Sequence, residues 1–138
     1  MISILAHQLT PEQIAELGGE PTHIREIDPK LAAGSPLGDR GIPPGLLIVY
    51  CPPEREMLFE MARRLCDIAM EQEDHRILAG SGSPAFTASL GLCLGLNLSY
   101  DDIVLIFAHS ERVSEDQPQP DGSVKKVSTF KHIKFFKV

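Results

Sequence analysis

The sequence lacks the features that place a chain in or across a membrane. No apolar run approaches the ~20 residues that a membrane-spanning helix needs, and no basic segment followed by a long apolar stretch stands at the N-terminus. Cysteines are also scarce: Cys51, Cys66 and Cys93 are odd in number, widely spaced and without a Cys-x-x-Cys pair. This spacing argues against a disulfide framework and a zinc site, and is typical of buried thiols in a reducing compartment. We therefore expect a cytoplasmic protein with no membrane partner.

Several catalytic signatures are missing as well. The five histidines are scattered, and no pair of them has a metal-ligand spacing with a carboxylate. The sequence has neither a nucleophile elbow nor a Ser/His/Asp order that would support acyl transfer. The prediction is a protein that uses no metal and no other cofactor.

Acidic residues are absent from the last fifteen positions, 124–138, which carry five lysines. The preceding 123 residues hold all 19 acidic residues and the other eight of the 13 basic residues, so their net charge is −11, against −6 for the whole chain. A protein that wraps duplex nucleic acid presents a broad basic face, and this chain lacks the charge for one. The charge fits either a small anionic ligand held by one basic strand or a lysine-protected edge strand.

The composition is that of one globular domain, which we expect to span residues 1–138. Hydrophobic residues make up 43% of the chain and charged residues 23%, both ordinary values, and the length suffices for a core. We predict a strand over 2–6, a helix from the capping box Thr10–Gln13 to Gly18-Gly19, and a second strand over 23–27. A strand, a helix and a strand at this spacing predict a right-handed parallel crossover.

The remaining elements complete a small α/β domain. Residues 28–45 are rich in glycine and proline and are predicted to be loop, and the run 46–50 fits a strand better than a helical turn. The other predicted elements are an amphipathic helix over 53–73, a strand over 76–79, a helix over 85–96, a strand over 102–108, a reversal at Asp121-Gly122 between the segments 113–115 and 123–128, and a strand over 130–138. The fold class is therefore α/β, with a mainly parallel sheet, flanking helices and an antiparallel C-terminal hairpin extension.

The helix expected over 85–96 is apolar nearly all round. A helix without a polar face needs burial on more than one side. In a chain this small, a sheet beneath the helix and a second subunit above it would supply that burial. We therefore expect a homodimer.

A glycine-serine turn joins the strand over 76–79 to this helix. Ser83 has the place of an N-cap and Pro84 that of the first helical residue, so backbone N–H groups and the helix dipole would point at whatever lies above the turn. Because Gly80 and Gly82 carry no side chain, a phosphodiester could approach the main chain closely. The residues expected to form this anion cradle are Gly80, Ser81, Gly82 and Ser83. A plain strand-to-helix connection explains the same residues equally well.

Polar groups follow three of the predicted strands at their carboxyl ends, where ligands bind in parallel sheets. They are His7, Gln8 and Thr10 after the first strand, the glycine-serine turn, and Ser110 and Arg112 after the strand over 102–108. This set suits metal-independent phosphodiester chemistry, in which a ribose 2′-hydroxyl of the ligand attacks the adjacent phosphate.

In that chemistry Arg112 would stabilise charge on the phosphoryl oxygens, and a histidine would protonate the leaving 5′-oxygen. His7 is the first candidate for this acid and His132, on the basic strand, the second. A structural role for either histidine, or a surface salt bridge from Arg112 to Glu111 or Glu115, is the alternative.

Four segments carry a resemblance to a known family: the start over 3–13, the turn over 78–81, the strand end over 110–112 and the tail over 121–135. Together they resemble the small CRISPR-associated ring nucleases of type III systems, relatives of the CRISPR-associated Rossmann-fold sensor domains. Residues 28–75 match poorly, and Ala79 and Ser81 stand where the family more often has an acidic residue or glutamine.

The resemblance implies a Rossmann-like fold and a homodimer that binds cyclic oligoadenylate, usually the tetra-adenylate, across its two-fold axis. It implies that the protein opens the ring and ends the antiviral signal, with Lys131 of the tail among the ligand-binding residues. A second hypothesis is a non-catalytic sponge or sensor with the same pocket. A third is a nucleotide-binding or regulatory module unrelated to CRISPR signalling.

Overall fold

The computed structural model describes residues 1–5, 8–32, 55–80 and 84–138 of the 138-residue chain, and the side chains of 55–57 are left out. Its elements form an α/β fold around one five-stranded sheet with the strand order β2-β1-β3-β4-β5. The strands are β1 (Ile2–Ser3), β2 (Thr22–His23), β3 (Arg76–Ala79), β4 (Val104–Pro118) and β5 (Val124–Lys137). β1 pairs in parallel with β2 and β3, β3 pairs in parallel with β4, and β4 pairs antiparallel with β5. The sheet is therefore mixed, and the predicted α/β class with an antiparallel C-terminal hairpin is confirmed.

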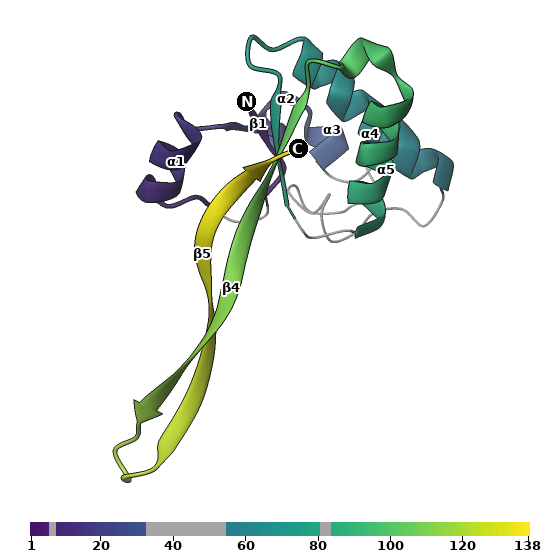
Figure 1. Cartoon of the computed structure of the whole chain (residues 1–138). Helices are drawn as coiled ribbons and strands as arrows, with labels where there is room; N and C mark the ends of the chain where they lie inside the picture. The colour runs from purple at the N-terminus through teal and green to yellow at the C-terminus, as the bar shows by residue number, and fades with distance from the viewer. Residues whose placement is uncertain (6–7, 33–54, 81–83) are drawn as a thin grey trace.

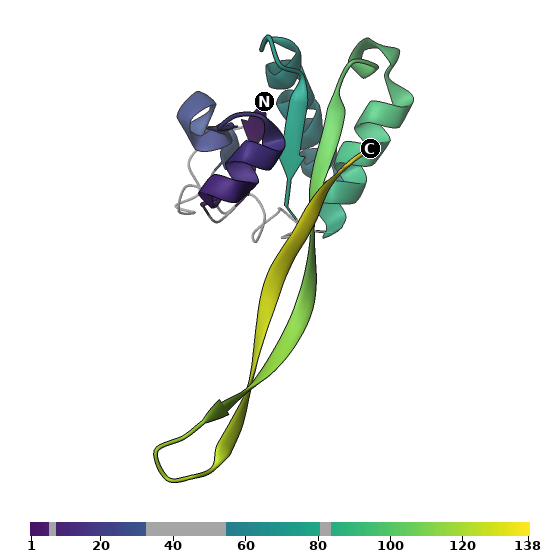
Figure 2. The same cartoon turned by 60° about the vertical axis from the view of Figure 1, so that its left-hand side comes forward.

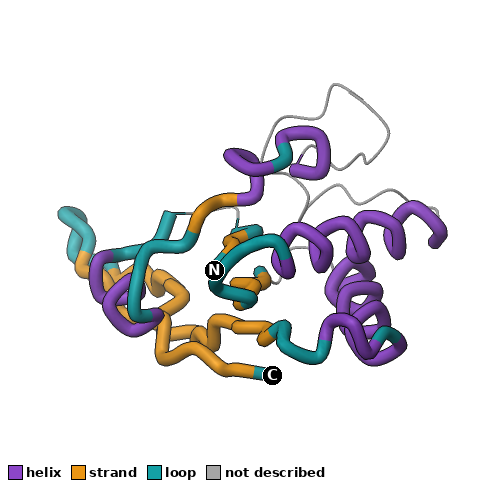
Figure 3. The backbone as a smooth tube through the Cα atoms, turned by 90° about the horizontal axis from the view of Figure 1, so that it is seen from above, coloured by secondary structure: helices purple, strands orange, loops and turns teal. Residues whose placement is uncertain are grey.

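Helices cover both faces of the parallel part of the sheet (Figures 1 and 3). The helix α1 (Pro11–Leu17) lies on one face, where Leu5, Leu17, Leu78 and Ile106 form a small core cluster. The helices α4 (Arg55–Met70) and α5 (Pro84–Leu96) lie on the other face, over the larger cluster. The alternation of side chains along each strand explains this division: Ile77, Ala79 and Leu105 point to α4 and α5, whereas Leu78 and Ile106 point to α1.

The predicted ends of α1 are confirmed. The Thr10 side chain accepts a hydrogen bond from the Gln13 backbone N–H, and the Gln13 side chain accepts one from the Thr10 N–H, which makes a complete capping box. Gly18 ends the helix in the left-handed conformation, with φ 79°. A residue with a Cβ would be strained there, so glycine is the natural C-terminal cap.

The prediction of a strand over 23–27 is wrong beyond its first residue. β2 ends at His23, and α2 (Ile24–Ile27) follows at once. His23 caps α2, because its Nδ1 accepts a hydrogen bond from the Arg25 N–H at 3.1 Å. Ile24 and Ile27 are three residues apart and both pack on the larger core cluster, so the apolar spacing fits a helical turn as well as a strand.

The loop predicted over 28–45 contains a helical turn, α3 (Pro29–Ala32), at its start. Asp28 caps this turn by accepting a hydrogen bond from the Leu31 N–H at 3.0 Å, and Leu31 is buried. The proline at the first helical position suits such a turn. The run 46–50 lies outside the described residues. The helices predicted over 53–73 and 85–96 and the strand over 76–79 are confirmed as α4, α5 and β3.

The largest departure from the sequence prediction is the length of the C-terminal hairpin. β4 does not end at residue 108 but continues to Pro118, and each of its residues from Ile106 onward has a partner in β5, with a register shift between His109 and Ser110. A five-residue loop, 119–123, closes the hairpin, and Gly122 has φ 82° there. We call residues 109–134 of this hairpin the arm, because they extend away from the helices and the rest of the sheet (Figures 1 and 2).

Candidate functional site

The register of the arm places four polar and aromatic side chains on one of its faces. Ser110 lies opposite His132, and Arg112 lies opposite Phe130. Residues opposite each other share a face, and residues two apart along a strand share it too. We call these four residues the Arg112 face: Ser110, Arg112, Phe130 and His132.

Arg112 and Phe130 are exposed together on this face. Phe130 is 78% exposed, a high value for a phenylalanine, and Arg112 is exposed as well. The side chain of Arg112 forms no ion pair or hydrogen bond with any other described residue, so the alternative of a salt bridge to Glu111 or Glu115 is not realised there. The Glu111 carboxylate instead lies 3.6 Å from His109 Nε2. A free guanidinium beside an exposed aromatic ring can bind a phosphate and stack on a base.

His132 is tied to α1 at the base of the arm. Its Nε2 lies 3.0 Å from Glu16 Oε2, and the other carboxylate oxygen of Glu16 accepts a hydrogen bond from the Phe135 N–H at 2.8 Å. These two contacts, that from Phe135 first, lower the pKa of Glu16 from its ordinary value. His132 Nδ1 is buried without a partner among the described residues. The ring could donate a proton to a ligand only after Nε2 leaves Glu16.

Lys131 lies on the opposite face of the arm. It faces Glu111, one residue away from Arg112 along β4, so its side chain points away from the Arg112 face. Lys131 therefore does not share a face with Arg112 and His132, and its predicted role in ligand binding stays a prediction.

The predicted convergence of three segments at the carboxyl ends of the strands is realised only in part. Ser110 and Arg112 do not follow the end of a strand, because β4 continues through them into the arm. The hydroxyl of Thr10 is used by the capping box, although the side chain is exposed. Gly80 does follow β3 directly. His7, Ser81, Gly82 and Ser83 lie outside the described residues.

Gln8 lines a cleft of about 500 Å³ beneath α1, at the edge of the sheet. The other lining residues include Ser3, Ile14, His23 and Arg25. Ile14 and Glu16 are two positions apart and so point about 200° apart on α1, which separates this cleft from the Arg112 face. The structure thus gives two separate candidate surfaces.

The cleft contains two residues that the sequence analysis did not select, His23 and Arg25. His23 Nε2 lies 2.8 Å from the Leu5 carbonyl, and Nδ1 accepts hydrogen bonds from the Arg25 N–H and Nε–H. This pattern assigns the neutral tautomer with the proton on Nε2, and it leaves neither nitrogen free for acid–base work. His23 ends β2 and Arg25 lies in the first turn of α2, so both stand at the junction of a strand and a helix. The sequence analysis missed this junction because it assigned 23–27 to one strand.

The largest shifts of pKa belong to structural contacts. Arg76 holds the pKa of Asp74 far below its usual range through a bidentate ion pair, with the nearest N–O distance 2.6 Å. Burial raises the pKa of the Cys66 and Cys93 thiols, which makes them inert. Burial and a 2.5 Å hydrogen bond to Asp67 raise the pKa of Tyr100 to about 12.

No metal site and no membrane span are found within the described ranges. No group of three or more His, Cys, Asp or Glu side chains there could hold a metal ion. None of the helices in the same ranges is long and apolar enough to cross a membrane.

A family model matches residues 1–136, which include the whole arm. The chain belongs to the uncharacterized protein MJ1673 family. No curated protein and no solved structure matches it. The description of the MJ1673 family names no activity, so a functional assignment for this member depends on its own residues.

Proposed function

We propose that this protein binds cyclic oligoadenylate, in particular cyclic tetra-adenylate, and linearises it without a metal, which would end type III CRISPR signalling. In this reaction a 2′-hydroxyl of the ligand loses its proton and attacks the adjacent phosphorus. The bond from phosphorus to the 5′-oxygen breaks, and that oxygen takes up a proton. The proposal also places the protein in the cytoplasm. It places the fold among Rossmann-like folds, and the parallel strand order β2-β1-β3-β4 supports this assignment of the fold.

One observation carries the proposal: Arg112, whose guanidinium has no ion-pair or hydrogen-bond partner among the described residues, is the register partner of the exposed Phe130. Adenine bases stack on aromatic rings, and arginine binds phosphate in a bidentate manner. Arg112 would stabilise the charge that develops on the phosphoryl oxygens as the new bond forms.

A homodimer would present two copies of the Arg112 face to one ring. A cyclic tetranucleotide with two-fold symmetry offers equivalent phosphates to equivalent residues of two subunits. The outer side of α5 supports a second subunit, because Leu92 is 54% and Leu96 76% exposed on a helix without a single charged residue.

A non-catalytic sponge or sensor is the second candidate, and the state of His132 favours it. Both ring nitrogens are turned away from a ligand, one to Glu16 and one into the protein. Cleavage would then depend on His7 as the proton donor, or on release of His132 from Glu16.

The test is incubation of the protein with labelled cyclic tetra-adenylate in EDTA, followed by separation of ring and linear products. We expect a linear product. Arg112→Ala should lower the cleavage rate by ~100-fold or more, as for the loss of one preorganised charge donor. Phe130→Ala should weaken binding by ~10-fold or more, since stacking contributes about 1–3 kcal/mol per base.

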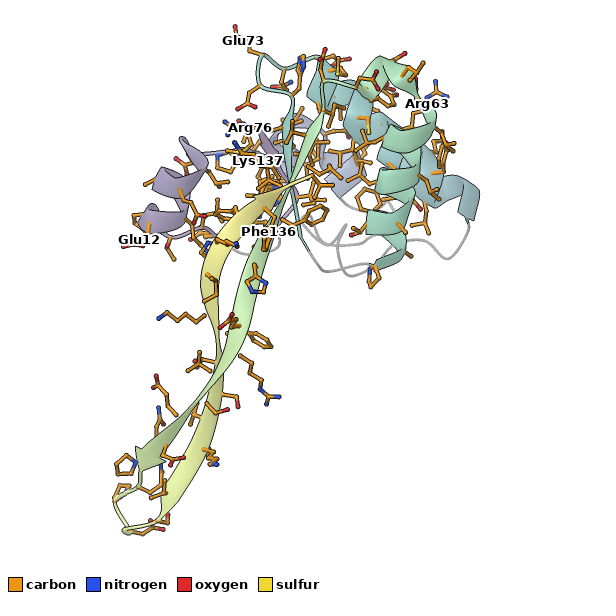
Figure 4. All side chains as sticks on the ribbon, in the orientation of Figure 1. Glu12, Arg63, Glu73, Arg76, Phe136 and Lys137 are labelled. Atoms are coloured by element: carbon orange, nitrogen blue, oxygen red, sulfur yellow. The ribbon has the colours of Figure 1, made fainter. Side chains whose placement is uncertain are left out.

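Arg63→Ala is the matched control, because it removes the same charge from α4, far from the arm (Figure 4). Ring bound intact by the parent protein would establish the sponge in place of the nuclease. Failure of the parent to bind the ring, or equal effects of Arg63→Ala and Arg112→Ala, would refute the proposal.

A further inference from the structure

The contact between His132 and Glu16 depends on an irregularity in β5. The register of β5 on β4 skips Ile133, which has no partner. In a regular strand, residues three apart, such as His132 and Phe135, point to opposite faces. The extra residue forms a β-bulge that brings both side chains to the side of the sheet that α1 covers, where their ring centroids lie 4.5 Å apart.

The bulge allows one carboxylate to hold both residues. Glu16 Oε2 lies 3.0 Å from His132 Nε2, and Glu16 Oε1 accepts a hydrogen bond from the Phe135 N–H at 2.8 Å. An ionised carboxylate only accepts hydrogen bonds, so Nε2 carries a hydrogen and donates it to Glu16. The proton that His132 would give to a ligand is therefore committed to Glu16.

This contact satisfies only one of the two ring nitrogens. His132 Nδ1 is buried and has no partner among the described residues. In the neutral ring Nδ1 is an acceptor without a donor, and in the charged ring it is a donor without an acceptor. A buried polar atom without a partner destabilises the conformation that contains it. The side chain of Glu16 is 39% exposed, so water can replace the ring there while the bond from Phe135 remains.

A phosphodiester bound to Arg112 is well placed to compete with Glu16 for His132. His132 is the register partner of Ser110, and Arg112 lies two residues further along β4 on the same face, so Arg112 and His132 are diagonal neighbours. Diagonal neighbours in a sheet are about 7–8 Å apart, a gap that one phosphate between two long side chains can bridge. The phosphate offers His132 an anionic acceptor in exchange for the carboxylate.

We infer that the contact between Glu16 and His132 is an autoinhibitory latch, which ring binding opens and which limits the cleavage rate. The inference rests on the proposed function and assigns its proton donor. Once a ligand phosphate has replaced Glu16, Nε2 of the protonated His132 gives its proton to the leaving 5′-oxygen as the bond from phosphorus to that oxygen breaks. The proton of the 2′-hydroxyl goes to water, and water later returns a proton to His132.

The opposite role for Glu16, that of a carboxylate which assists a catalytic histidine, does not fit this geometry. In a catalytic triad the carboxylate binds one ring nitrogen and orients the other toward the substrate. In His132 that other nitrogen, Nδ1, is buried. Glu16 is therefore a positioning residue that keeps His132 out of the reaction.

Ring cleavage by Glu16→Gln tests the latch. Glutamine keeps an acceptor for the Phe135 N–H but loses the charge that holds His132, so the released fraction of His132 rises. We expect cleavage in EDTA to be ~5-fold faster than in the parent, or more. The gain should vanish when His132→Asn is added, because the released ring is its cause. Circular dichroism checks that each variant is folded.

Glu12→Gln is the matched control. It removes the same charge from the same side of α1, one turn earlier, and Glu12 has no hydrogen bond or ion pair to β5 within the described ranges (Figure 4). The parent rate should persist in this variant. Slower cleavage by Glu16→Gln, equal acceleration by both variants, or acceleration that survives His132→Asn overturns the inference.

Histidine ¹⁵N spectra of the full chain show the latch directly. The His132 signals are those that His132→Asn lacks, and they should shift when the 2′-deoxy analogue of cyclic tetra-adenylate, which has no attacking hydroxyl, is bound. A bound analogue that leaves them unchanged overturns the inference, and the proposed function stands if the parent still cleaves the ring. A ring bound intact by the parent and by Glu16→Gln overturns the inference and establishes the sponge. A parent that does not bind the ring refutes the proposed function and the inference with it.

Discussion

Glu16 connects the helix α1 and the strand β5 through one carboxylate. Its oxygens contact His132 Nε2 and the Phe135 N–H of β5, while its backbone belongs to α1. The contact therefore fixes the base of the arm against the helix that covers one face of the sheet. Both bonds favour the ionised carboxylate, which is why the pKa of Glu16 is lowered in the folded protein.

Glu16→Gln should make the protein less stable at neutral pH, and the difference from the parent should disappear in acid. A carboxyl group whose pKa is lowered by folding stabilises the fold fully above its unfolded pKa of about 4.3 and loses that effect as the pH falls through the lower folded value. Thermal unfolding of both proteins between pH 7 and pH 3 measures this. Glu73→Gln, in the turn before β3 and without an ion pair to another described residue, is the control (Figure 4). A difference that does not change with pH would mean that the charge of Glu16 contributes nothing.

At the scale of single elements, α1 shows how a short segment becomes ordered. It has only seven residues, too few for an isolated helix to persist in water. Its two caps satisfy terminal backbone groups, and Leu17 packs on Leu5, Leu78 and Ile106. Caps and packing together, and not helix propensity, therefore hold α1 in place.

Thr10→Ala should lower the free energy of unfolding by about 1 kcal/mol, because the Gln13 N–H loses its acceptor. Urea denaturation should show a lower midpoint with an unchanged slope. Thr10→Ser keeps the hydroxyl and should behave like the parent. Equal midpoints for all three proteins would exclude a stabilising role for the capping box.

Elements with local signals could be predicted from the sequence, and those that depend on distant pairing could not. The capping box, Gly18 and the apolar stripe of α4 are local, and the structure contains the elements that they predict. The prediction of a strand over 24–27 failed because two isoleucines three residues apart fit a strand and a helical turn alike. The length of the arm was not predicted because residues 109–118 are polar at most positions. Nothing in the sequence of β4 alone distinguishes a paired strand from a loop there.

The candidate site was predictable in its residue types but not in its geometry. Arg112 was selected for its charge, and the structure leaves it unpaired among the described residues. Its neighbour Phe130 and the position of Lys131 on the other face of the arm follow only from the register of β4 on β5, including the shift at His109 and Ser110. A shift of one residue exchanges the two faces of a strand, and no single-strand pattern in the sequence fixes that register.

At the scale of the whole molecule, the arm divides the protein into a part with a core and a part without one. Among the described residues, all buried side chains lie outside the arm, in the part of the chain that we call the body. The body should therefore fold without the outer arm. Val113 and Thr129 lie directly opposite each other, which makes them suitable ends for a shorter hairpin. Replacement of residues 114–128 by Asn-Gly would join them with a two-residue turn of the kind that fits a twisted hairpin.

This shortened protein should fold, remain a dimer, retain Arg112 and Phe130 and still open the ring. It loses no residue of the proposed site, and the uncharged outer side of α5, where Leu92 and Leu96 are exposed, is unchanged. Circular dichroism and thermal unfolding check that the body is intact, sedimentation gives the mass, and the EDTA assay gives the activity. A folded monomer that cleaves cyclic tetra-adenylate at the parent rate would mean that one chain holds a complete site. A folded dimer that no longer cleaves the ring would mean that the outer arm contributes to the site.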